Sequence, residues 1–543
     1  MRAQCFVVLS MLALTATGAQ AQWTSNPLVN TPAAVGAGDQ ATPLIRPTSD
    51  GGAWVVWADN TPGPGYRHKV QRFDALGVAQ LPAGGVTINT RNNTANFVYD
   101  MEVGPGDIAY VTYDNSGMWL QAVEPNGSLP WGSQGIVMPS SSGAVGGQVC
   151  VCGDGSLVVC YALSNVLNFK RVFDDGSFDT SWTLAEASRG QAPSDMVASG
   201  SGSDFILLWV RSETTNMVTS RKGLKIQKWD DTDSPVWNGG VAIDVYASSA
   251  SPSRGIQSGY FPALVADGAG GAVMAWYDTG ADRNAWLQHY TSAGVAKFAV
   301  NGFAASTTTS ATEFRLSASV AYRSRVGLDD YMIVYERSNP AQSLYGLGAQ
   351  LILENGVRQW GGAGVEINPI AGNHCSFVNA NPAGPNDYAA TWLQYLGANG
   401  PMEIRSTRLD LNTGAPVWSP AQLGVSTNAI NKTRLGVIKS ATSDMLIAAW
   451  ADGASGSADI LAQNINVDGT LGPAGPACDS IDFNADGLYP DTADIDDFLS
   501  VFSGGPCSND PNCHDIDFNN DSLYPDTLDI DSLLSVFSGG ACL

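Results

Sequence analysis

The sequence predicts a mainly β protein: a β-propeller of seven or eight blades, followed by a small module of α-helices. Two observations predict this fold. Eight short segments rich in β-forming residues recur before residue 471, and each holds an aromatic residue at the same place. From residue 478, a unit with the apolar spacing of a helix occurs twice.

Residues 1–21 have the pattern of a secretory signal peptide. One arginine precedes an apolar run from Phe6 to Leu14, and Ala19-Gln20-Ala21 has the form of a cleavage site. The mature chain is therefore expected to start at Gln22 and to be secreted, as an extracellular or cell-surface protein. No later apolar run reaches membrane-spanning length, so no transmembrane segment is expected.

Residues 22–470 are predicted to form the propeller. The spacing between the shared aromatics of its β-rich segments is 48 to 67 residues. A polar turn precedes each segment, a second strand follows it, and several units add a third element with Trp or Gly. Repeats of about 40–50 residues with several short strands are typical of propeller blades. The aromatics are expected to pack between blades, and we call them the anchors: Trp57, Tyr113, Tyr161, Trp209, Trp276, Tyr335, Trp392 and Trp450.

The ring is expected to close through its N-terminal segment. The first full unit starts only near Thr42, so the segment near Trp23–Val29 is predicted to add a strand to the last blade. An open ring would leave unpaired strand edges. The alternative is a string of β-sandwiches, for which units of about 90–100 residues are typical.

The body offers few groups for catalysis. Its three histidines (His68, His289 and His374) fall in different units and are expected to be surface or hydrogen-bonded residues. Carboxylates at the ends of the anchor strands either line one end of the ring, as in propeller glycosidases, or cap turns. These carboxylates are Asp59, Asp114, Asp278, Glu336 and Asp452. Catalytic residues are therefore unknown from the sequence.

Two further function classes are disfavoured. Cys150, Cys152 and Cys160, even with His374-Cys375, lack the usual spacing of a zinc site, so buried thiols or a disulfide are expected. The net charge of −24 disfavours nucleic-acid binding.

A Gly- and Pro-rich linker, residues 471–477, separates the body from a duplicated tail, residues 478–543. The tail holds two units at a period of 35 residues, identical at 22 of 30 positions, each beginning and ending on Cys. It contains 14 Asp but no Glu, Lys or Arg, so cations are needed to keep it compact. The four cysteines (Cys478, Cys507, Cys513 and Cys542) either pair within each unit or join the two units.

The spacing of oxygen-bearing side chains in each unit predicts a calcium loop. Such loops take side-chain ligands at positions 1, 3 and 5 and a backbone carbonyl at position 7. These positions are Asp482, Asn484, Asp486 and Leu488 in the first unit, and Asp517, Asn519, Asp521 and Leu523 in the second. Hard oxygen ligands favour Ca²⁺, so two Ca²⁺ sites are expected. Gly487 suits the sharp turn of the first loop, whereas the second has Ser522.

One helix is expected after each loop. Ile495, Phe498, Leu499 and Phe502 are spaced as on one helix face, and Ile530, Leu533, Leu534 and Phe537 repeat the pattern. Gly504-Gly505 and Gly539-Gly540 are expected to end the helices.

Two tandem loop–helix calcium units resemble the dockerin family, type I in layout, and the Cys-bounded units that end in Ser-Gly-Gly-x-Cys resemble a variant of planctomycete-type secreted proteins. The resemblance implies further Asp ligands at positions 9 and 12. Here the corresponding residues, Asp491, Asp494, Asp526 and Asp529, fall at positions 10 and 13, with Asp496 and Asp531 as substitutes.

The resemblance implies docking to a cohesin-like or other surface-anchoring protein. The body is then expected to be a non-catalytic binding or scaffold propeller with a polysaccharide or protein ligand. The alternatives are a carbohydrate-active enzyme, either a glycoside hydrolase or a lyase, delivered by the tail, and a structural envelope component.

Overall fold

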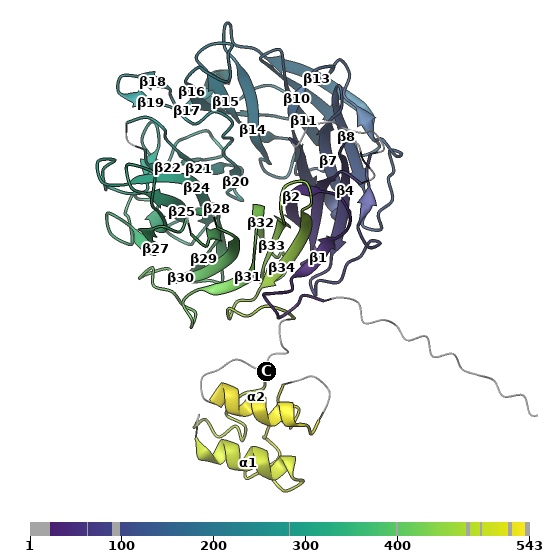
Figure 1. Ribbon diagram of the computed structural model, residues 1–543, viewed down its shortest axis with the longest axis vertical. Coiled ribbons are helices and arrows are strands. Elements are labelled where there is room, and N and C mark those ends of the chain that lie inside the picture. The colour runs from purple at the N-terminus through teal and green to yellow at the C-terminus, as the bar shows by residue number, and fades with distance from the viewer. Residues whose placement is uncertain are drawn as a thin grey trace, which may run out of the picture.

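The computed structural model describes residues 22–537, except residues 62, 64, 90–97, 282, 398–399, 474–477, 489–490 and 520–523. The predicted signal peptide therefore lies outside the described residues. Those residues form an eight-bladed β-propeller and two small C-terminal helices (Figure 1). The prediction of a propeller is confirmed, the number of blades is eight, and the alternative of a string of sandwiches is wrong.

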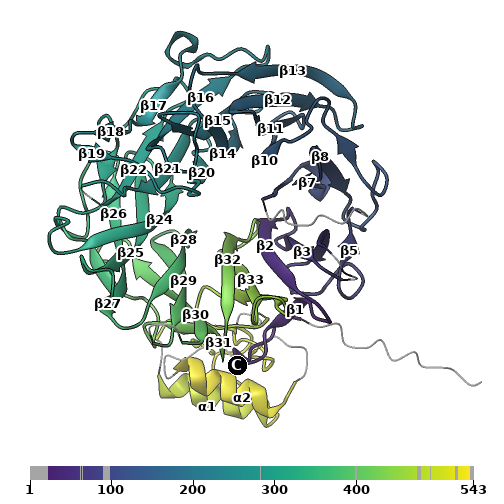
Figure 2. The same ribbon diagram turned by 45° about the horizontal axis from the view of Figure 1, so that its top comes forward.

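Seven blades of the described chain are each built from four consecutive antiparallel strands, with the first strand nearest the centre of the ring (Figure 2). Blade 1 consists of β2 (Gln40–Pro47), β3 (Ala53–Asp59), β4 (Arg67–Phe73) and β5 (Val86–Thr87), and blade 2 of β6 (Asp100–Val103), β7 (Ala109–Asp114), β8 (Met118–Val123) and β9 (Ile136–Val137). Blade 3 consists of β10 (Val145–Val151), β11 (Leu157–Leu163), β12 (Val166–Val172) and β13 (Phe178–Leu184). Blade 4 consists of β14 (Gln191–Ala198), β15 (Phe205–Ser212), β16 (Lys222–Trp229) and β17 (Ile243–Tyr246).

Blades 5 to 7 follow the same plan. Blade 5 consists of β20 (Leu264–Ala266), β21 (Ala272–Tyr277), β22 (Ala285–Tyr290) and β23 (Phe303–Ala304). Blade 6 consists of β24 (Phe314–Arg323), β25 (Asp330–Ser338), β26 (Tyr345–Leu353) and β27 (Val365–Ala371). Blade 7 consists of β28 (Cys375–Ala383), β29 (Asp387–Tyr395), β30 (Met402–Asp410) and β31 (Leu423–Ile430). A short hairpin, β18 (Ser249–Ala250) and β19 (Ser253–Arg254), lies between blades 4 and 5 in the sequence.

The eighth blade joins the two ends of the body. Its inner strands are β32 (Lys432–Lys439), β33 (Leu446–Asp452) and β34 (Asp459–Ile465), and its outermost strand is β1 (Thr31–Ala34). Thr31 pairs with Ala462 across an antiparallel ladder. Closure by the N-terminal segment is confirmed, but its predicted position at Trp23–Val29 is wrong.

The segment before β1 has a different role, because its groups bond to neighbouring blades. The indole N–H of Trp23 donates to the Ala75 carbonyl in blade 1 at 2.9 Å, and the Pro27 carbonyl accepts from the Thr427 N–H in blade 7 at 2.8 Å. Residues 22–30 therefore bond on both sides of the closing blade, while β1 supplies the strand.

The anchors lie between blades, as predicted. Each belongs to a buried core that also contains residues of the preceding blade; Trp57 of blade 1, for example, packs with Ile447 and Ala449 of blade 8. All eight anchors are at most 1% exposed. Eight cores of this kind make the ring one continuous packed body rather than a row of independent units.

A second contact, at the turn after the third strand, also links neighbouring blades. The Trp237 indole N–H of blade 4 donates to the Ser292 carbonyl of blade 5 at 3.0 Å. Its ring covers Gly294, at φ +76°, where an added Cβ would lie 2.6 Å from the indole. The same arrangement holds for Trp131 over Gly176, Trp360 over Gly414, Trp418 over Gly469 and Trp23 over Gly77. In these other blades, the tryptophan that contacts the next blade belongs to the blade itself. For blade 8, Trp23 of the N-terminal segment makes this contact to blade 1.

A buried glutamine recurs on the third strand of six blades in the described chain. In blade 5, Gln288 donates to the Phe298 carbonyl at 3.2 Å and accepts from the Phe298 N–H at 3.1 Å, which fixes the segment leading to the fourth strand. In blade 8, Gln463 makes its bonds to Thr24 and Asn30 of the N-terminal segment. The six glutamines are at most 1% exposed: Gln71, Gln121, Gln227, Gln288, Gln350 and Gln463.

Candidate functional site

The tail contains one helix per predicted loop, as expected. These are α1 (Thr492–Phe502) and α2 (Thr527–Phe537). Phe483, Phe498, Phe518 and Leu533 form their common buried core. Helix α1 ends before Gly504, whose φ is +84°, while Gly539-Gly540 lies outside the described residues.

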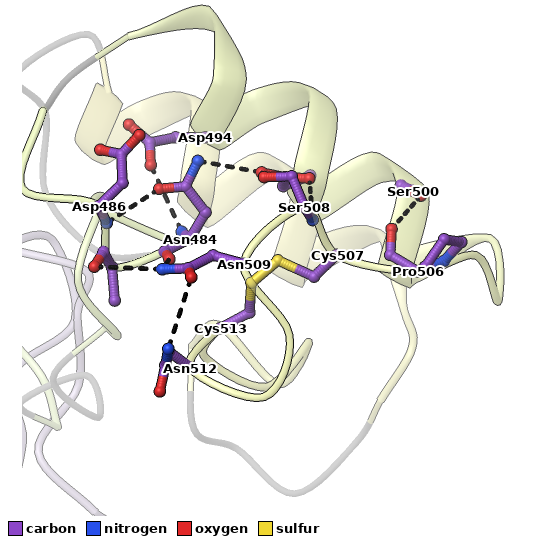
Figure 3. The surroundings of a disulfide bond; sticks show 12 residues. Asn484, Asp486, Asp494, Ser500, Pro506, Cys507, Ser508, Asn509, Asn512 and Cys513 are labelled. Atoms are coloured by element: carbon purple, nitrogen blue, oxygen red, sulfur yellow. Dashed lines mark hydrogen bonds between the residues drawn. A yellow bond between two sulfur atoms is a disulfide. The ribbon is translucent and has the colours of Figure 1, made fainter.

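The first predicted loop turns back on itself through its own oxygen atoms. Asp482 accepts from the N–H groups of Asp486 and Gly487 at 3.0 and 3.1 Å. Asn484 Oδ1 accepts from Asp486 N–H at 3.1 Å (Figure 3). The Leu488 N–H bonds to Asp486 at 2.8 Å. Gly487 has φ +83°, which confirms the need for glycine at this turn.

Asp491 and Asp494 form the capping box of α1. Asp491 accepts from the N–H groups of Ala493 and Asp494, and Asp494 Oδ2 accepts from Asp491 N–H at 3.2 Å. Asp494 is fully buried beneath the loop, and its Oδ1 lies 3.5 Å from Asn484 N. Burial, reinforced by the charges of Asp491 and Asp482, raises the pKa of Asp494.

The second unit repeats this arrangement where it is described. Asp526 caps α2 through Leu528 N–H at 2.7 Å, and Asp529 accepts from Asp526 N–H at 3.0 Å. Asp529 is also fully buried, and the described residues supply no hydrogen bond of ordinary geometry to its Oδ1 atom. Burial raises the pKa of Asp529, with Asp526 and Asp517 adding to the effect.

The remaining predicted ligands are placed in part. Asn519 is buried near the start of the second loop, while Asp521, Leu523 and Ser522 lie outside the described residues. Asp496 and Asp531, the suggested substitutes, are exposed on their helices. Among the described residues, no three His, Cys, Asp or Glu side chains are grouped closely enough to hold a metal ion.

A residue that the sequence reasoning missed, Asp497, supports the first loop. Its carboxylate accepts from Asn484 Nδ2 at 3.0 Å and from Ser508 N–H and Oγ at 2.8 and 2.5 Å. These bonds lower its pKa although burial opposes the shift. Asn509 donates to the Asn484 carbonyl at 2.7 Å (Figure 3). The residue that corresponds to Asp497 in the second unit is Ser532.

A disulfide between Cys507 and Cys513 encloses this supporting segment (Figure 3). It joins the end of the first unit to the start of the second. Of the two pairings considered, closure of the first unit on itself is therefore wrong, and a link between the units is confirmed. Cys542 lies outside the described residues.

On the propeller, two carboxylates at the ends of anchor strands serve the fold. Asp59 accepts from Thr61 N–H at 2.7 Å and pairs with Lys69 at 3.1 Å. Asp452 pairs with the buried Lys432 at 2.8 Å. The interpretation of these carboxylates as structural residues is confirmed for this pair.

The acids that end the anchor strands of blades 5 and 6 have different partners. Asp278 caps its turn by accepting from the N–H groups of Gly255 and Gly280 at 3.0 and 2.8 Å. Glu336 is 5% exposed and bonds instead to the imidazole Nε2 of His374 at 2.5 Å. It lines a pocket of about 450 Å³ at the end of the ring where the second strands finish.

Aromatic rings hold the His374 side chain of this pocket in place. The imidazole lies between Tyr345 and Tyr395, with ring centroids 4.1 and 4.8 Å away. Tyr277 also lines the pocket, and its hydroxyl bonds to Gln257. Burial, with the charge of Glu336, raises the pKa of Tyr277 to about 12.

Two acids on the innermost strands also have shifted pKa values. Burial raises the pKa of Asp100 to about 7, although Arg46 lies 3.3 Å away, and raises that of Asp195 to about 6. Each carboxylate accepts an N–H from the inner strand of the next blade, from Val149 at 3.0 Å and from Leu264 at 2.7 Å. These bonds tie neighbouring inner strands together.

The other histidines and the cysteines of the body are buried. His68 bonds to Asn89 at 3.0 Å, and burial lowers its pKa to about 4. His289 bonds to Asp267 and Tyr331 at 3.0 and 2.7 Å. Both are structural, as expected. The cysteines are free buried thiols: Cys150, Cys152, Cys160 and Cys375.

No protein-family model matches the sequence, and no curated protein matches it. Among solved structures, the chain is similar to the BP39L lectin from Burkholderia pseudomallei, with 14% identity and a TM-score of 0.40 over 69% of this chain and 98% of the lectin. It is similar to a dihydro-heme d1 dehydrogenase, with 10% identity and a TM-score of 0.43 over 84% of this chain and 81% of that one. It is similar to a GH43 endo-arabinanase from Bacillus licheniformis, with 11% identity and a TM-score of 0.26 over 48% of this chain and 98% of that one. None of these likenesses indicates an activity for this chain.

In the described part of the chain, no helix has the length and apolar character needed to span a membrane.

Proposed function

We propose that this protein is a non-catalytic recognition propeller, attached to a cohesin-like or other surface-anchoring partner by a calcium-dependent, dockerin-like tail. One observation carries the proposal. Asp494 and Asp529 are fully buried carboxylates at equivalent places, in a segment that has neither Lys nor Arg. Buried carboxylates of this kind need a cation nearby to remain charged.

The donor types suit Ca²⁺, and binding of the ion would have to bring carboxylates closer together than they lie in the described residues. Asp482, Asn484, Asp486 and Asp494 place carboxylate and amide oxygens on one short loop and the helix start beside it, and hard oxygen donors are those that Ca²⁺ prefers. The bound ion would neutralise these carboxylates, and the Leu488 carbonyl would add a backbone oxygen. The second unit offers Asp517, Asn519, Asp526 and Asp529, together with Asp521 and Leu523.

The surface of the tail favours a protein partner. Several large apolar side chains on and beside the two helices are exposed although the module has its own core. They are Leu488, Leu499, Leu528, Leu534 and Tyr524, with exposed fractions from 44% to 66%. Exposed apolar groups concentrated on so small a module are typical of binding surfaces.

The full chain is expected to bind immobilised cohesin modules in Ca²⁺ and to be released by EGTA, because the loops position the helices. A chain that ends at residue 473 is the control and should not bind, while its propeller remains folded by circular dichroism. Binding that persists unchanged in EGTA, or binding by the truncated chain, would contradict the role given to the tail.

The first loop is expected to bind Ca²⁺ more tightly than the second, because the Asp497 carboxylate accepts from Asn484 and Ser508, whereas the second unit has a neutral hydroxyl, that of Ser532, at this position. The substitution Asp497→Ser installs the residue of the second unit. Loss of two or more hydrogen bonds should weaken the first site by about tenfold, as measured by calorimetry on the full chain. Asp510→Ser, at an exposed position of the tail outside both predicted loops, is the matched control; equal effects of the two changes would refute the supporting role.

A carbohydrate-active enzyme is the second candidate function. The observation that favours it is the pair of raised pKa values at Asp100 and Asp195, since general acids of glycosidases have raised pKa values. Against it, both carboxylates are committed to backbone N–H groups of the next blade. Reducing ends released from polysaccharides by the full chain, and lost in Asp195→Asn, would establish the enzyme instead.

A further inference from the structure

Blades 5 and 6 and the start of blade 7 form a pocket whose residues indicate a class of ligand. This inference rests on the proposed recognition function. The walls of the pocket include Gln257, Tyr277, Arg283, Glu336, Tyr345 and His374. Its volume of about 450 Å³ lies within the range typical of small-molecule sites, about 300–1,000 Å³.

The carboxylate of Glu336 is the central feature of this pocket. Glu336 follows its anchor by one residue, whereas the acids of blades 1, 5 and 8 follow theirs by two. Those three acids have partners from the fold: a lysine at 3.1 and 2.8 Å in blades 1 and 8, and two backbone N–H groups in blade 5. Among the described residues, the Glu336 carboxylate bonds to neither a lysine nor a backbone N–H group; it bonds to the His374 imidazole. A nearly buried carboxylate with acceptor capacity to spare can take hydroxyl donors from a ligand.

The position of His374 is fixed in advance of binding. Its ring stacks on Tyr395 and packs against the tilted ring of Tyr345, and the Nε2 atom must carry the proton to donate to the Glu336 carboxylate. The Tyr345 hydroxyl is also held, by the Gln342 carbonyl at 2.8 Å. A site with side chains already ordered loses less entropy when a ligand binds.

The charges on the wall narrow the ligand class. Arg283 is stacked over Phe314 at 4.3 Å and lies on the same pocket as Glu336, so one positive and one negative group face the ligand. Glu336 disfavours polyanions, and Arg283 disfavours cations. Gln257 and Gln342 add amides that both donate and accept, and the tyrosines add apolar ring surface.

We propose that this pocket binds a neutral, hydroxyl-rich saccharide, with the Glu336 carboxylate, held in place by His374, accepting hydrogen bonds from its hydroxyl groups and Tyr345 contacting a ring face. Paired hydroxyls match a carboxylate with free acceptor positions, and the alternating apolar and polar faces of a sugar ring match tyrosine beside amides. The propeller would thereby present a small sugar site at one end of the ring.

The test is a binding screen of the full chain, in Ca²⁺, against two- to six-residue oligosaccharides of neutral hexoses and pentoses and of uronic acids. Binding by neutral oligosaccharides is expected. Glu336→Gln and Tyr345→Ala should each weaken it by about tenfold or more. Asp174→Asn is the matched control, because Asp174 lines a pocket of about 430 Å³ at the opposite end of the ring; it should leave binding unchanged.

Thermal melting of each variant shows whether the ring stays folded, and Glu336→Gln preserves side-chain shape if Tyr345→Ala does not fold. Absence of neutral-saccharide binding, preference for uronic acids, or binding that survives both substitutions would overturn the inference. Cohesin binding by the tail is measured independently, so a failed saccharide screen leaves the proposed attachment standing, and a failed attachment leaves the saccharide site standing.

Discussion

A chain that lacks residues 22–34 is expected to lose stability throughout the propeller, not only in its last blade. The deletion removes β1, so β34 becomes an unpaired edge strand, and it removes the Trp23 contact to blade 1. Because the eight cores between blades are contiguous around the ring, opening one junction weakens the packing on both sides. Thermal unfolding and limited proteolysis should both show the loss in all blades.

The contribution of Trp23 can be separated from that of the strand. Trp23→Ala removes a 2%-exposed side chain and should cost about 3–5 kcal/mol of the free energy of unfolding. Val29→Ala, in the same segment but at a 63%-exposed position, should change it by less than about 0.5 kcal/mol. If the deleted chain keeps seven blades as protease-resistant as the intact protein, the closed ring is not a single cooperative unit.

Removal of Ca²⁺ is expected to unfold the tail while the propeller stays folded. Asp494 and Asp529 are buried in a segment without Lys or Arg, so without a cation they must be protonated or lose their burial. At a free Ca²⁺ concentration 100 times the dissociation constant, each site stabilises the folded tail by about 2.7 kcal/mol. Hydrogen exchange of the full chain in EGTA should therefore lose protection in α1 and α2 only.

The substitutions Asp494→Asn and Asp529→Asn together provide the control. They remove both buried charges at nearly constant volume, so the tail should retain protection in EGTA and respond little to Ca²⁺. Equal protection of the unsubstituted tail with and without Ca²⁺ would refute the calcium-dependent fold.

Much of the fold could be predicted from the sequence because its signals are local and repeated. The anchors recur once per blade, and each is buried, so periodicity alone located the second strand of every blade. The closing strand was misplaced because Trp23 and Thr31 lie close together in the sequence, and only the three-dimensional ring shows that Trp23 packs on Gly77 while Thr31 pairs with Ala462.

The candidate sites were predicted less evenly. The loop residues were visible as a spacing, yet Asp497 was not, because its partners Asn484 and Ser508 lie on either side of it in the chain and meet only in the folded tail. The acids Asp59 and Glu336 both lie at the end of an anchor strand, but Asp59 follows its anchor by two residues and Glu336 by one. Lys69 pairs with Asp59, whereas His374 at the start of the next blade bonds to Glu336, and the folded ring is needed to bring that histidine to the acid.

The pairing of Thr31 with Ala462 also determines when the ring can form during protein synthesis. At about 5–20 residues per second, β34 leaves the ribosome on the order of tens of seconds after β1. During that time β1 has no strand to pair with, while blades 1 to 7 already have all four of theirs. A chain that folds as it is made would therefore pass through an open ring with an exposed edge, and its ring cannot close before β34 is available.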